Sequence, residues 1–317
     1  MCENNQTVVT EFFVLGFKNI HSIRILVFSF FMLTYIVILI GNVLIIVLVT
    51  TCHHLHSPMY VFLKNLAYAD ILFTTNIMPN MLYVILMEGD YLSHVGCLIQ
   101  YYVFCGSTYA QSLILSAMAF DRYLAICHPL RYATIMDYKL CRHLLSWPWV
   151  IGFLLILIEM VSLFQLRFCG SSFIEHYFCD FIPILENASS DTSAVKTEDL
   201  LFSFLLVFVP FVFVVLSYFF IFISILKINS MSGRWKAFST CSAHLATLFI
   251  FYGTQITIYM FPVGGNSYSE NMLKSLLYTV FTPFINPILY SMRNTEIRKA
   301  TQFLFSRKGK QTYPFKA

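Results

Sequence analysis

Long runs of apolar residues alternate with short polar segments along this chain of 317 residues. An α-helix needs about 20 mainly apolar residues to cross the hydrocarbon core of a bilayer. Runs of that length occur seven times, at Ile25–Val49, Met59–Leu86, Cys97–Ile126, Leu140–Phe164, Leu200–Leu226, Ala237–Phe261 and Leu273–Met292. The runs are continuous rather than alternating, which excludes the strands of a membrane β-barrel. We therefore predict an all-α membrane protein, a seven-transmembrane helix bundle.

The polar segments are too short to separate domains, so we predict one domain over residues 1–317. It divides into an N-terminal segment (1–24), the seven helices (25–292) and a tail (293–317). The tail begins as a short amphipathic helix, because Ile297, Ala300 and Leu304 fall on one face while Arg298 and Lys299 can reach lipid headgroups. Composition agrees with a membrane protein, since 58% of the residues are hydrophobic and only 11% are charged.

Lysine and arginine are unequally divided between the two sets of polar segments, and the richer set is expected to face the cytoplasm. The poorer set, which includes the N-terminal segment, carries only Lys18, Arg24, Arg167, Lys196 and Lys274. The N-terminus is therefore expected outside the cell and the C-terminus inside. Two glycosylation sequons, which begin at Asn5 and Asn187, fall on the outer side.

Short motifs recur in a fixed order along the seven runs. They are Gly41-Asn42, Leu55-His56-Ser57-Pro58-Met59-Tyr60, Leu66-Ala67-Tyr68-Ala69-Asp70, Met118-Ala119-Phe120-Asp121-Arg122-Tyr123, Ser217-Tyr218, Lys236-Ala237-Phe238-Ser239-Thr240-Cys241, Phe251-Tyr252-Gly253 and Pro283-Phe284-Ile285-Asn286-Pro287-Ile288-Leu289-Tyr290. In this order and spacing the chain resembles the odorant (olfactory) receptors, a rhodopsin-like family of G-protein-coupled receptors. It is most similar to their land-vertebrate branch, and the resemblance covers nearly the whole chain.

The resemblance implies a receptor that binds small, volatile, mostly apolar molecules within the bundle and activates the stimulatory olfactory G protein, which raises cyclic AMP. It implies a plasma-membrane location in the cilia of olfactory neurons. It also implies an activation switch in which Arg122 pairs with Asp121 at rest and is released toward the G protein. The other residues of this switch would be Tyr123, Tyr218, Asn286, Pro287 and Tyr290.

Rhodopsin-like receptors bind ligands among the outer halves of the third, fifth, sixth and seventh helices. The corresponding residues here are Phe104, Cys105, Thr108, Tyr109, Ser112, Phe202, Ser203, Leu206, Tyr252, Gln255, Ile256, Tyr259, Leu276 and Thr279. Such a pocket would be apolar and aromatic with a few hydroxyl groups, which suits a small ligand held largely by burial. For each residue, packing between helices is the alternative to ligand contact. Phe104 and Val280 replace the aspartate of aminergic receptors and the retinal-binding lysine of opsins.

Besides Asp121, two carboxyl groups lie inside predicted spans, where charges usually mark functional sites. In related receptors the position of Asp70 helps to bind sodium, but the glutamate often found in the third helix is Gln111 here. A hydrogen-bonded polar core of Asp70 with Asn42 and Asn286 is therefore the alternative to a sodium site. Glu159 occupies a position in the fourth helix where the family commonly has histidine. It would either attract a basic odorant or face water or a polar neighbour.

The resemblance also implies a disulfide between Cys97 and Cys179. The family usually has a further bridge in the same outer loop, for which Cys169 is in place, but Ser189 occupies the position of its partner. We expect this crosslink to be lost, with Cys2 as an alternative partner for Cys169, and a possible glycan at Asn187 to be gained. Cys52, Cys127, Cys141 and Cys241 are expected on the cytoplasmic side, in the reduced state.

Other classes of protein remain as alternatives. A metabolite-sensing receptor of the same fold differs only in ligand and tissue. A transporter or channel would show inverted repeats or broken helices with charges at mid-membrane, and neither pattern is visible. No paired catalytic set occurs within a span, so we expect no enzyme activity. We expect no resident cofactor and no nucleic-acid partner.

Overall fold

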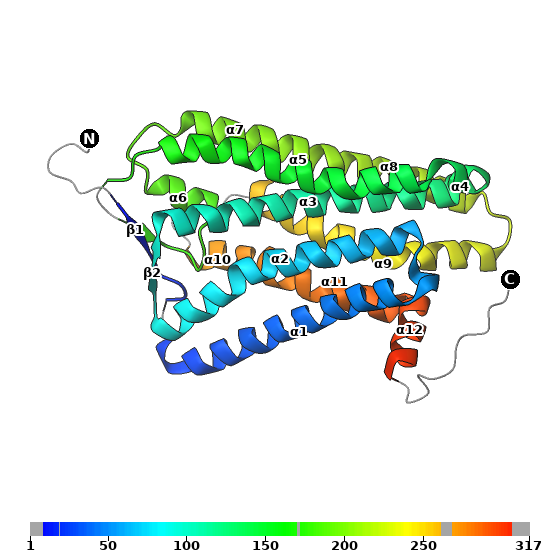
Figure 1. Cartoon of the computed structure of the whole chain (residues 1–317), viewed down its shortest axis with the longest axis horizontal. Coiled ribbons are helices and arrows are strands. Elements are labelled where there is room, and N and C mark those ends of the chain that lie inside the picture. The colour runs from blue at the N-terminus through cyan, green and yellow to red at the C-terminus, as the bar shows by residue number, and fades with distance from the viewer. Residues whose placement is uncertain (1–8, 19, 170–171, 261–267, 306–317) are drawn as a thin grey trace.

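The computed structural model describes residues 9–18, 20–169, 172–260 and 268–305. Long helical segments run side by side along the longest axis of the molecule and form a bundle (Figure 1). The first four are α1 (Arg24–Thr51), α2 (Pro58–Met87), α3 (His94–Cys127) and α5 (Tyr138–Gln165). The fifth joins α7 (Ser193–Ser203), η4 (Phe204–Phe208) and α8 (Val209–Leu226) without a break, and α9 (Met231–Met260) is the sixth. The seventh joins α10 (Tyr268–Leu276), η5 (Leu277–Phe281) and α11 (Thr282–Arg293).

Within the described residues, six helices are long and apolar enough to cross a membrane, namely the first five and the seventh. Their outward faces carry large apolar side chains, such as Leu26, Phe30 and Ile40 of α1, which are all more than 60% exposed. Such faces would be unfavourable in water and are stabilised in contact with lipid chains. The helix α3 is the most buried of the six, with 78% of its most apolar stretch enclosed by the other helices.

The ends of the helices follow from local sequence. Pro58 begins α2 at a position where its missing N–H costs nothing. The Ser93 side chain accepts a hydrogen bond from the Gly96 N–H and caps α3, while Asp137 caps α5 by accepting from the Leu140 N–H. Both η4 and η5 are π-helical turns inserted in otherwise α-helical segments. Each lies beside residues of the predicted ligand pocket.

A three-stranded sheet closes one end of the bundle, and the sequence pattern did not predict it. Its strands are β1 (Glu11–Val14), β2 (Asp90–Ser93) and β3 (Phe173–Ile174), in the order β2-β1-β3. The first strand pairs antiparallel with β2, with Val14 opposite Asp90, and parallel with β3, with Phe13 opposite Phe173. The sheet therefore joins the N-terminal segment to the loops before α3 and after α5.

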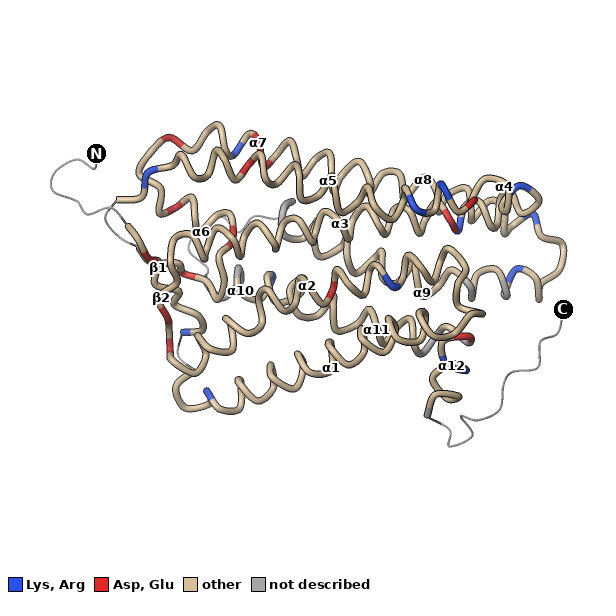
Figure 2. Tube along the Cα trace, in the orientation of Figure 1, with Lys and Arg blue, Asp and Glu red and all other residues tan. Residues whose placement is uncertain are grey.

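The turn into β2 depends on Glu88 and Gly89. Gly89 has a φ of +125°, and a Cβ atom there would lie 2.4 Å from the Phe13 ring, so this position requires glycine. The Glu88 carboxylate binds the His21 ring at 2.5 Å and the Arg24 guanidinium at 2.8 Å. The hydrogen bond from His21 lowers the pKa of Glu88. Acidic residues gather mainly at this end of the bundle (Figure 2).

Two short helices lie at the opposite end of the bundle, α4 (Tyr132–Ile135) and α12 (Thr295–Phe305) (Figure 1). The predicted amphipathic helix corresponds to α12. Its Ile297 and Ala300 side chains are buried, whereas Leu304 is 49% exposed, so only the first turns pack against the bundle. Another short helix, α6 (Phe181–Glu186), lies in the loop between α5 and α7.

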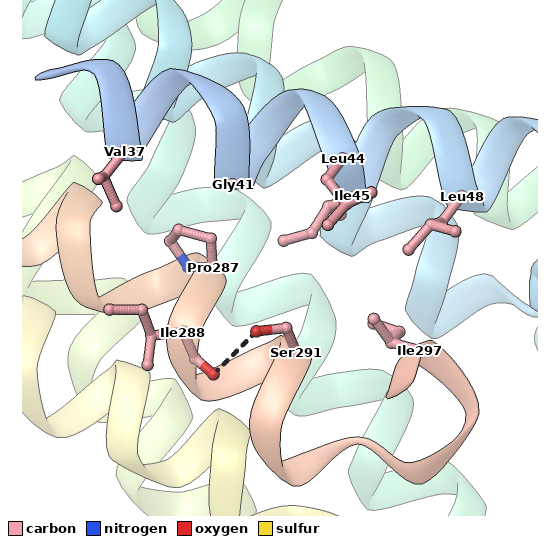
Figure 3. A pocket seen from close by; sticks show the side chains of 9 residues that line it. All are labelled: Val37, Gly41, Leu44, Ile45, Leu48, Pro287, Ile288, Ser291 and Ile297. Atoms are coloured by element: carbon pink, nitrogen blue, oxygen red, sulfur yellow. Dashed lines mark hydrogen bonds between the residues drawn. The ribbon is translucent and has the colours of Figure 1, made fainter. Parts of the chain in front are cut away.

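A small apolar groove of about 80 Å³ lies between α1 and α11 and ends at Ile297 (Figure 3). Gly41 and Pro287 face each other across it, and a Cβ atom on Gly41 would lie 2.8 Å from the Pro287 ring. The glycine thus allows α1 and α11 to approach closely, as small residues commonly do between membrane helices.

Candidate functional site

Most residues of the predicted ligand pocket lie together inside the half of the bundle that the sheet closes. The buried ones are Phe104, Cys105, Thr108, Tyr109, Ser112, Phe202, Leu206, Tyr252, Gln255 and Thr279, while Ser203 and Leu276 are half-buried. Ile256 differs from them, because 37% of its surface is exposed. The side chain of Tyr259 lies outside the described residues. The structure therefore gathers one cluster from four helical segments, α3, the fifth, α9 and the seventh.

Hydroxyl groups connect the helices across this cluster. The Ser112 and Tyr252 hydroxyls are 3.2 Å apart, and the Tyr252 hydroxyl also donates to the Ser112 carbonyl oxygen at 3.2 Å. The Tyr109 hydroxyl lies 3.5 Å from that of Ser203. The surrounding surface is aromatic and apolar, so these few groups are the ones that can orient a bound molecule.

A lid from the loop between α5 and α7 covers the cluster. Tyr177 and Phe178 of this loop are fully buried. The Tyr177 hydroxyl lies 2.7 Å from that of Thr279, and the Phe178 ring meets the Phe104 ring edge-on at 5.3 Å. Sequence reasoning missed both residues, although a pair of aromatic residues directly before the predicted bridge residue Cys179 was a usable signal.

The lid is fixed by covalent and polar contacts. The predicted disulfide between Cys97 and Cys179 is confirmed, and the Cys179 N–H donates to the Gln100 side-chain oxygen at 2.9 Å. His176, also in the lid, contacts the Ser275 hydroxyl at 3.0 Å. Burial lowers the pKa of His176 to about 3, so its ring is neutral at physiological pH. The lid is therefore held by the bridge at Cys179 and by hydrogen bonds, and an ion pair between Lys18 and Glu175 at 3.1 Å fixes the same loop to the N-terminal segment.

Glu159 does not face water, as one interpretation of the sequence had it, but is fully buried between α5 and α3. One carboxylate oxygen accepts a hydrogen bond from the Tyr101 hydroxyl at 2.7 Å, and the other oxygen has no partner among the described residues. On the neighbouring α7, Glu198 accepts from the Ser162 hydroxyl at 3.0 Å. A polar neighbour thus holds Glu159 one helical turn outside Cys105 of the predicted pocket.

Replacing Tyr101 by phenylalanine is expected to lower the free energy of unfolding by about 2 kcal/mol, because the buried Glu159 carboxyl group then loses its hydrogen bond. The same replacement in a Glu159→Leu background should lower the free energy of unfolding far less, since position 159 then has no carboxyl group to leave without a hydrogen bond. Thermal unfolding of the four purified proteins measures both effects. Equal costs in the two backgrounds would show that the hydrogen bond contributes nothing to stability.

Asp70 is the centre of a buried polar core, but its partners differ from those expected. Its carboxylate accepts hydrogen bonds from the amide groups of Asn286, at 3.0 and 3.3 Å, and of Gln111, at 3.3 Å. The prediction that Asn42 belongs to this core was wrong, because the Asn42 amide donates to the Ile38 carbonyl oxygen of its own helix. Amide hydrogens reach both Asp70 oxygens, whereas the buried side-chain oxygen of Asn286 has no hydrogen-bond partner among the described residues, so the sodium site stays a prediction.

The Asp121–Arg122 pair lies near the end of α3 opposite the sheet. The guanidinium donates to one Asp121 oxygen at 2.7 and 3.1 Å, and the Tyr132 hydroxyl of α4 donates to the other at 2.7 Å. Burial and the neighbouring Asp121 raise the pKa of Tyr132, which keeps it protonated as a donor. Tyr132 stands in the sequence motif, but its contact with Asp121 was not predicted.

Of the other predicted switch residues, Asn286 bonds to Asp70 and Pro287 lies against Gly41, away from this pair. The Tyr218 hydroxyl contacts the ring of buried His244 at 2.8 Å, which connects α8 to α9. Tyr290 is buried in α11 near the same end of the bundle. Tyr123 is half-buried, and its hydroxyl lies 3.1 Å from the ring of His128. The molecule thus has a pocket-like cluster toward the sheet and a charged pair toward α4, with Asp70 between them on α2.

The family model described as "Olfactory receptor" matches residues 31–308. The chain is 40% identical over 304 residues to human olfactory receptor 1M1, which covers 96% of this chain and 97% of the relative. It is 40% identical over 308 residues to human olfactory receptor 11A1, 97% of both chains, and 39% identical over 300 residues to rat olfactory receptor 1500, 95% and 96%. The chain belongs to the olfactory receptor family.

Membership of this family establishes the broad class of the protein. The olfactory receptor is a G-protein-coupled receptor with a seven-helix transmembrane bundle and is not an enzyme. It is a multi-pass protein of the plasma membrane. The transporter and channel alternatives are thereby removed. Within the described residues, no cluster of histidine, cysteine and acidic side chains could hold a metal ion.

The loop between α5 and α7 of this olfactory receptor answers part of the question left open about Cys169. Cys169 is disulfide-bonded although Ser189 stands at the position of the usual partner, which agrees with the expectation that Cys169 has another partner. The Ser189 hydroxyl bonds to both the N–H and the carbonyl oxygen of Cys169, at 3.2 and 3.1 Å. Cys2 and Asn5 lie outside the described residues. The Asn187 side-chain amide donates to the carbonyl oxygens of Phe173 and Pro183, both at 2.9 Å, and these contacts compete with a glycan.

Proposed function

We propose that this olfactory receptor binds small, weakly polar volatile molecules in the cluster between α3, α7, α9 and the seventh helix. The observation that carries the proposal is the lidded interior, where aromatic and aliphatic side chains surround a few hydroxyl groups. Burial of each ligand methylene contributes about 0.8 kcal/mol, so affinity grows with the size and fit of an apolar body. The hydroxyls of Tyr109, Ser112 and Tyr252 then select among molecules that carry one polar group.

The second part of the proposal is coupling to the stimulatory olfactory G protein, with cyclic AMP as the signal. The charged pair Asp121–Arg122 would be the two-state element, because Arg122 can exchange its carboxylate partner for contacts with the G protein. Tyr218, Tyr290 and Asn286 would stabilise the released form. Ligand and G protein then favour the same conformation from opposite ends of the bundle, which is the thermodynamic requirement for coupling.

The unequal distribution of lysine and arginine supports an orientation in which the sheet and the lid face outward. The α4 end would then face the cytoplasm and the G protein. We place the receptor in the cilia of olfactory neurons, as expected for a sensor of inhaled molecules.

The test is a cyclic AMP reporter assay in cells that express this receptor together with the olfactory G protein. A panel of odorants is applied, and surface staining of intact cells shows that the receptor is displayed. Dose-dependent responses that require both the receptor and the G protein would support the proposal. A displayed receptor that responds to metabolites, but to no volatile molecule, would replace it with the metabolite-sensing alternative.

A further inference from the structure

A cavity lies away from the ligand cluster, at the end of the bundle that carries α4. Its volume is about 680 Å³, and it opens between the ends of α1 and α2 on one side and the segment from Met136 to Leu145 on the other. Neither the ligand cluster nor the Asp121–Arg122 pair contributes to its walls. The proposed function therefore leaves this cavity unexplained.

Two residues with a permanent positive charge line this cavity, one from each of two helices. Lys64 belongs to α2 and Arg142 to α5, and neither forms an ion pair within the described part of the chain. The Arg142 guanidinium lies over the Tyr138 ring at 5.8 Å. The one carboxylate in the lining, Asp137, is engaged as the cap of α5 through the Leu140 N–H at 2.7 Å. The lining thus carries two positive charges and one carboxylate.

The position of Lys64 makes its lack of an anionic partner informative. It lies six residues after Pro58, which places it about 9 Å along α2 from the start of the helix. A charge within a membrane span is costly unless it finds a counter-charge or reaches the headgroup layer. The headgroups of the cytoplasmic leaflet include anionic phospholipids, which attract basic residues near the surface.

The rest of the cavity lining is apolar and suits the acyl chain of a phospholipid. Val49, Val61, Cys141 and Leu145 supply apolar walls beside the two basic residues. A molecule with a phosphate at one end and a hydrocarbon chain at the other matches this arrangement. A soluble anion would satisfy only the basic residues and would leave the apolar walls in water.

We propose that this cavity binds an anionic phospholipid, with its phosphate between Lys64 and Arg142 and the start of one acyl chain along the apolar walls. The proposed orientation of the receptor enters this inference at one point, where it names the cytoplasmic leaflet as the source of the lipid. It does not depend on odorant binding or on G-protein coupling, so it can be tested without a known ligand.

The experiment uses the purified full-length receptor in nanodiscs of phosphatidylcholine, with and without a minor fraction of phosphatidylinositol bisphosphate on both faces. The anionic lipid should raise the midpoint of thermal unfolding by about 2–4 °C or more. Lys64→Gln and Arg142→Gln should each lose at least half of this shift. Lys64→Arg should keep most of it because the charge remains.

Lys139→Gln is the matched control, because Lys139 is exposed, lies three residues before Arg142 and is not part of the cavity. It should keep the full shift. An equal loss in Lys139→Gln would show general surface attraction and overturn the proposal. A shift of the same size from soluble inositol trisphosphate would assign the site to a free phosphate instead. No shift in the wild-type protein would also overturn the proposal.

Discussion

Replacing Arg122 by alanine is expected to abolish the odorant-evoked rise in cyclic AMP while the receptor stays at the cell surface. Arg122 is the only cation that pairs with Asp121 in the described structure, and 15% of its side chain is exposed. Its guanidinium is therefore close to the proposed G-protein surface without forming part of the apolar core. Loss of this side chain removes the element that the G protein would bind in the active form.

The control for this prediction is Arg131→Ala, which removes an exposed arginine of the same region without a carboxylate partner among the described residues. Its response should stay within about threefold of the wild-type value, because exposed charges contribute little. The measurement is the maximal reporter response to any odorant that activates the wild-type receptor, normalised to surface staining. A wild-type response from Arg122→Ala at equal surface level would remove Arg122 from the coupling mechanism.

Replacing Cys97 by serine is expected to remove most of the receptor from the cell surface. The bridge to Cys179 closes a loop of 82 residues, and loss of such a bridge typically costs about 2–5 kcal/mol of folding free energy. It also releases the lid, because Tyr177 and Phe178 directly precede Cys179. Surface staining and the thermal midpoint of the purified protein measure the two effects.

Two further variants make the prediction specific to the bridge. Cys179→Ser should match Cys97→Ser, and the double variant should be no worse than either, because both single changes break one bond. Cys52→Ser changes a free, half-buried cysteine and should leave surface expression near the wild-type level. A Cys97→Ser receptor with unchanged expression and midpoint would mean that the hydrogen bonds of the lid suffice without the bridge.

The helix bundle could be predicted from the sequence because lipid imposes a length on each apolar run. The predicted second helix, for example, ends one residue before the observed end at Met87. The fifth helix was predicted to start at Leu200, but α7 begins at Ser193. The extra turns are polar and extend beyond the apolar run, so a search for apolar residues cannot detect them. The family motifs located the Asp121–Arg122 pair for a different reason, since they depend on spacing rather than hydropathy.

Apart from the disulfide that the family resemblance implied, contacts between distant segments could not be predicted. The strand Glu11–Val14 has neighbours near residues 90 and 173, and no local pattern identifies either of them. The partner of Asn42 was mispredicted because the choice between its own helix and Asp70 depends on a side-chain rotamer. The contact between Tyr132 and Asp121 likewise requires the path of the chain after α3. Sequence therefore predicted which residues are important more readily than the contacts they make.

The π-helical turns η4 and η5 affect how ligand positions can be transferred between relatives. A π-helical turn adds one residue to a turn of helix, so every residue after it is rotated by about 100° relative to a regular helix. Two receptors can therefore align without a gap and still direct equivalent residues of the fifth or seventh helix to different sides. A relative that lacks either turn would present a different face beside Leu206 or Thr279. Odorant specificity that is assigned from alignment columns alone will therefore mix residues that face the ligand with residues that face away. The presence or absence of each π-helical turn in the two receptors has to be compared first.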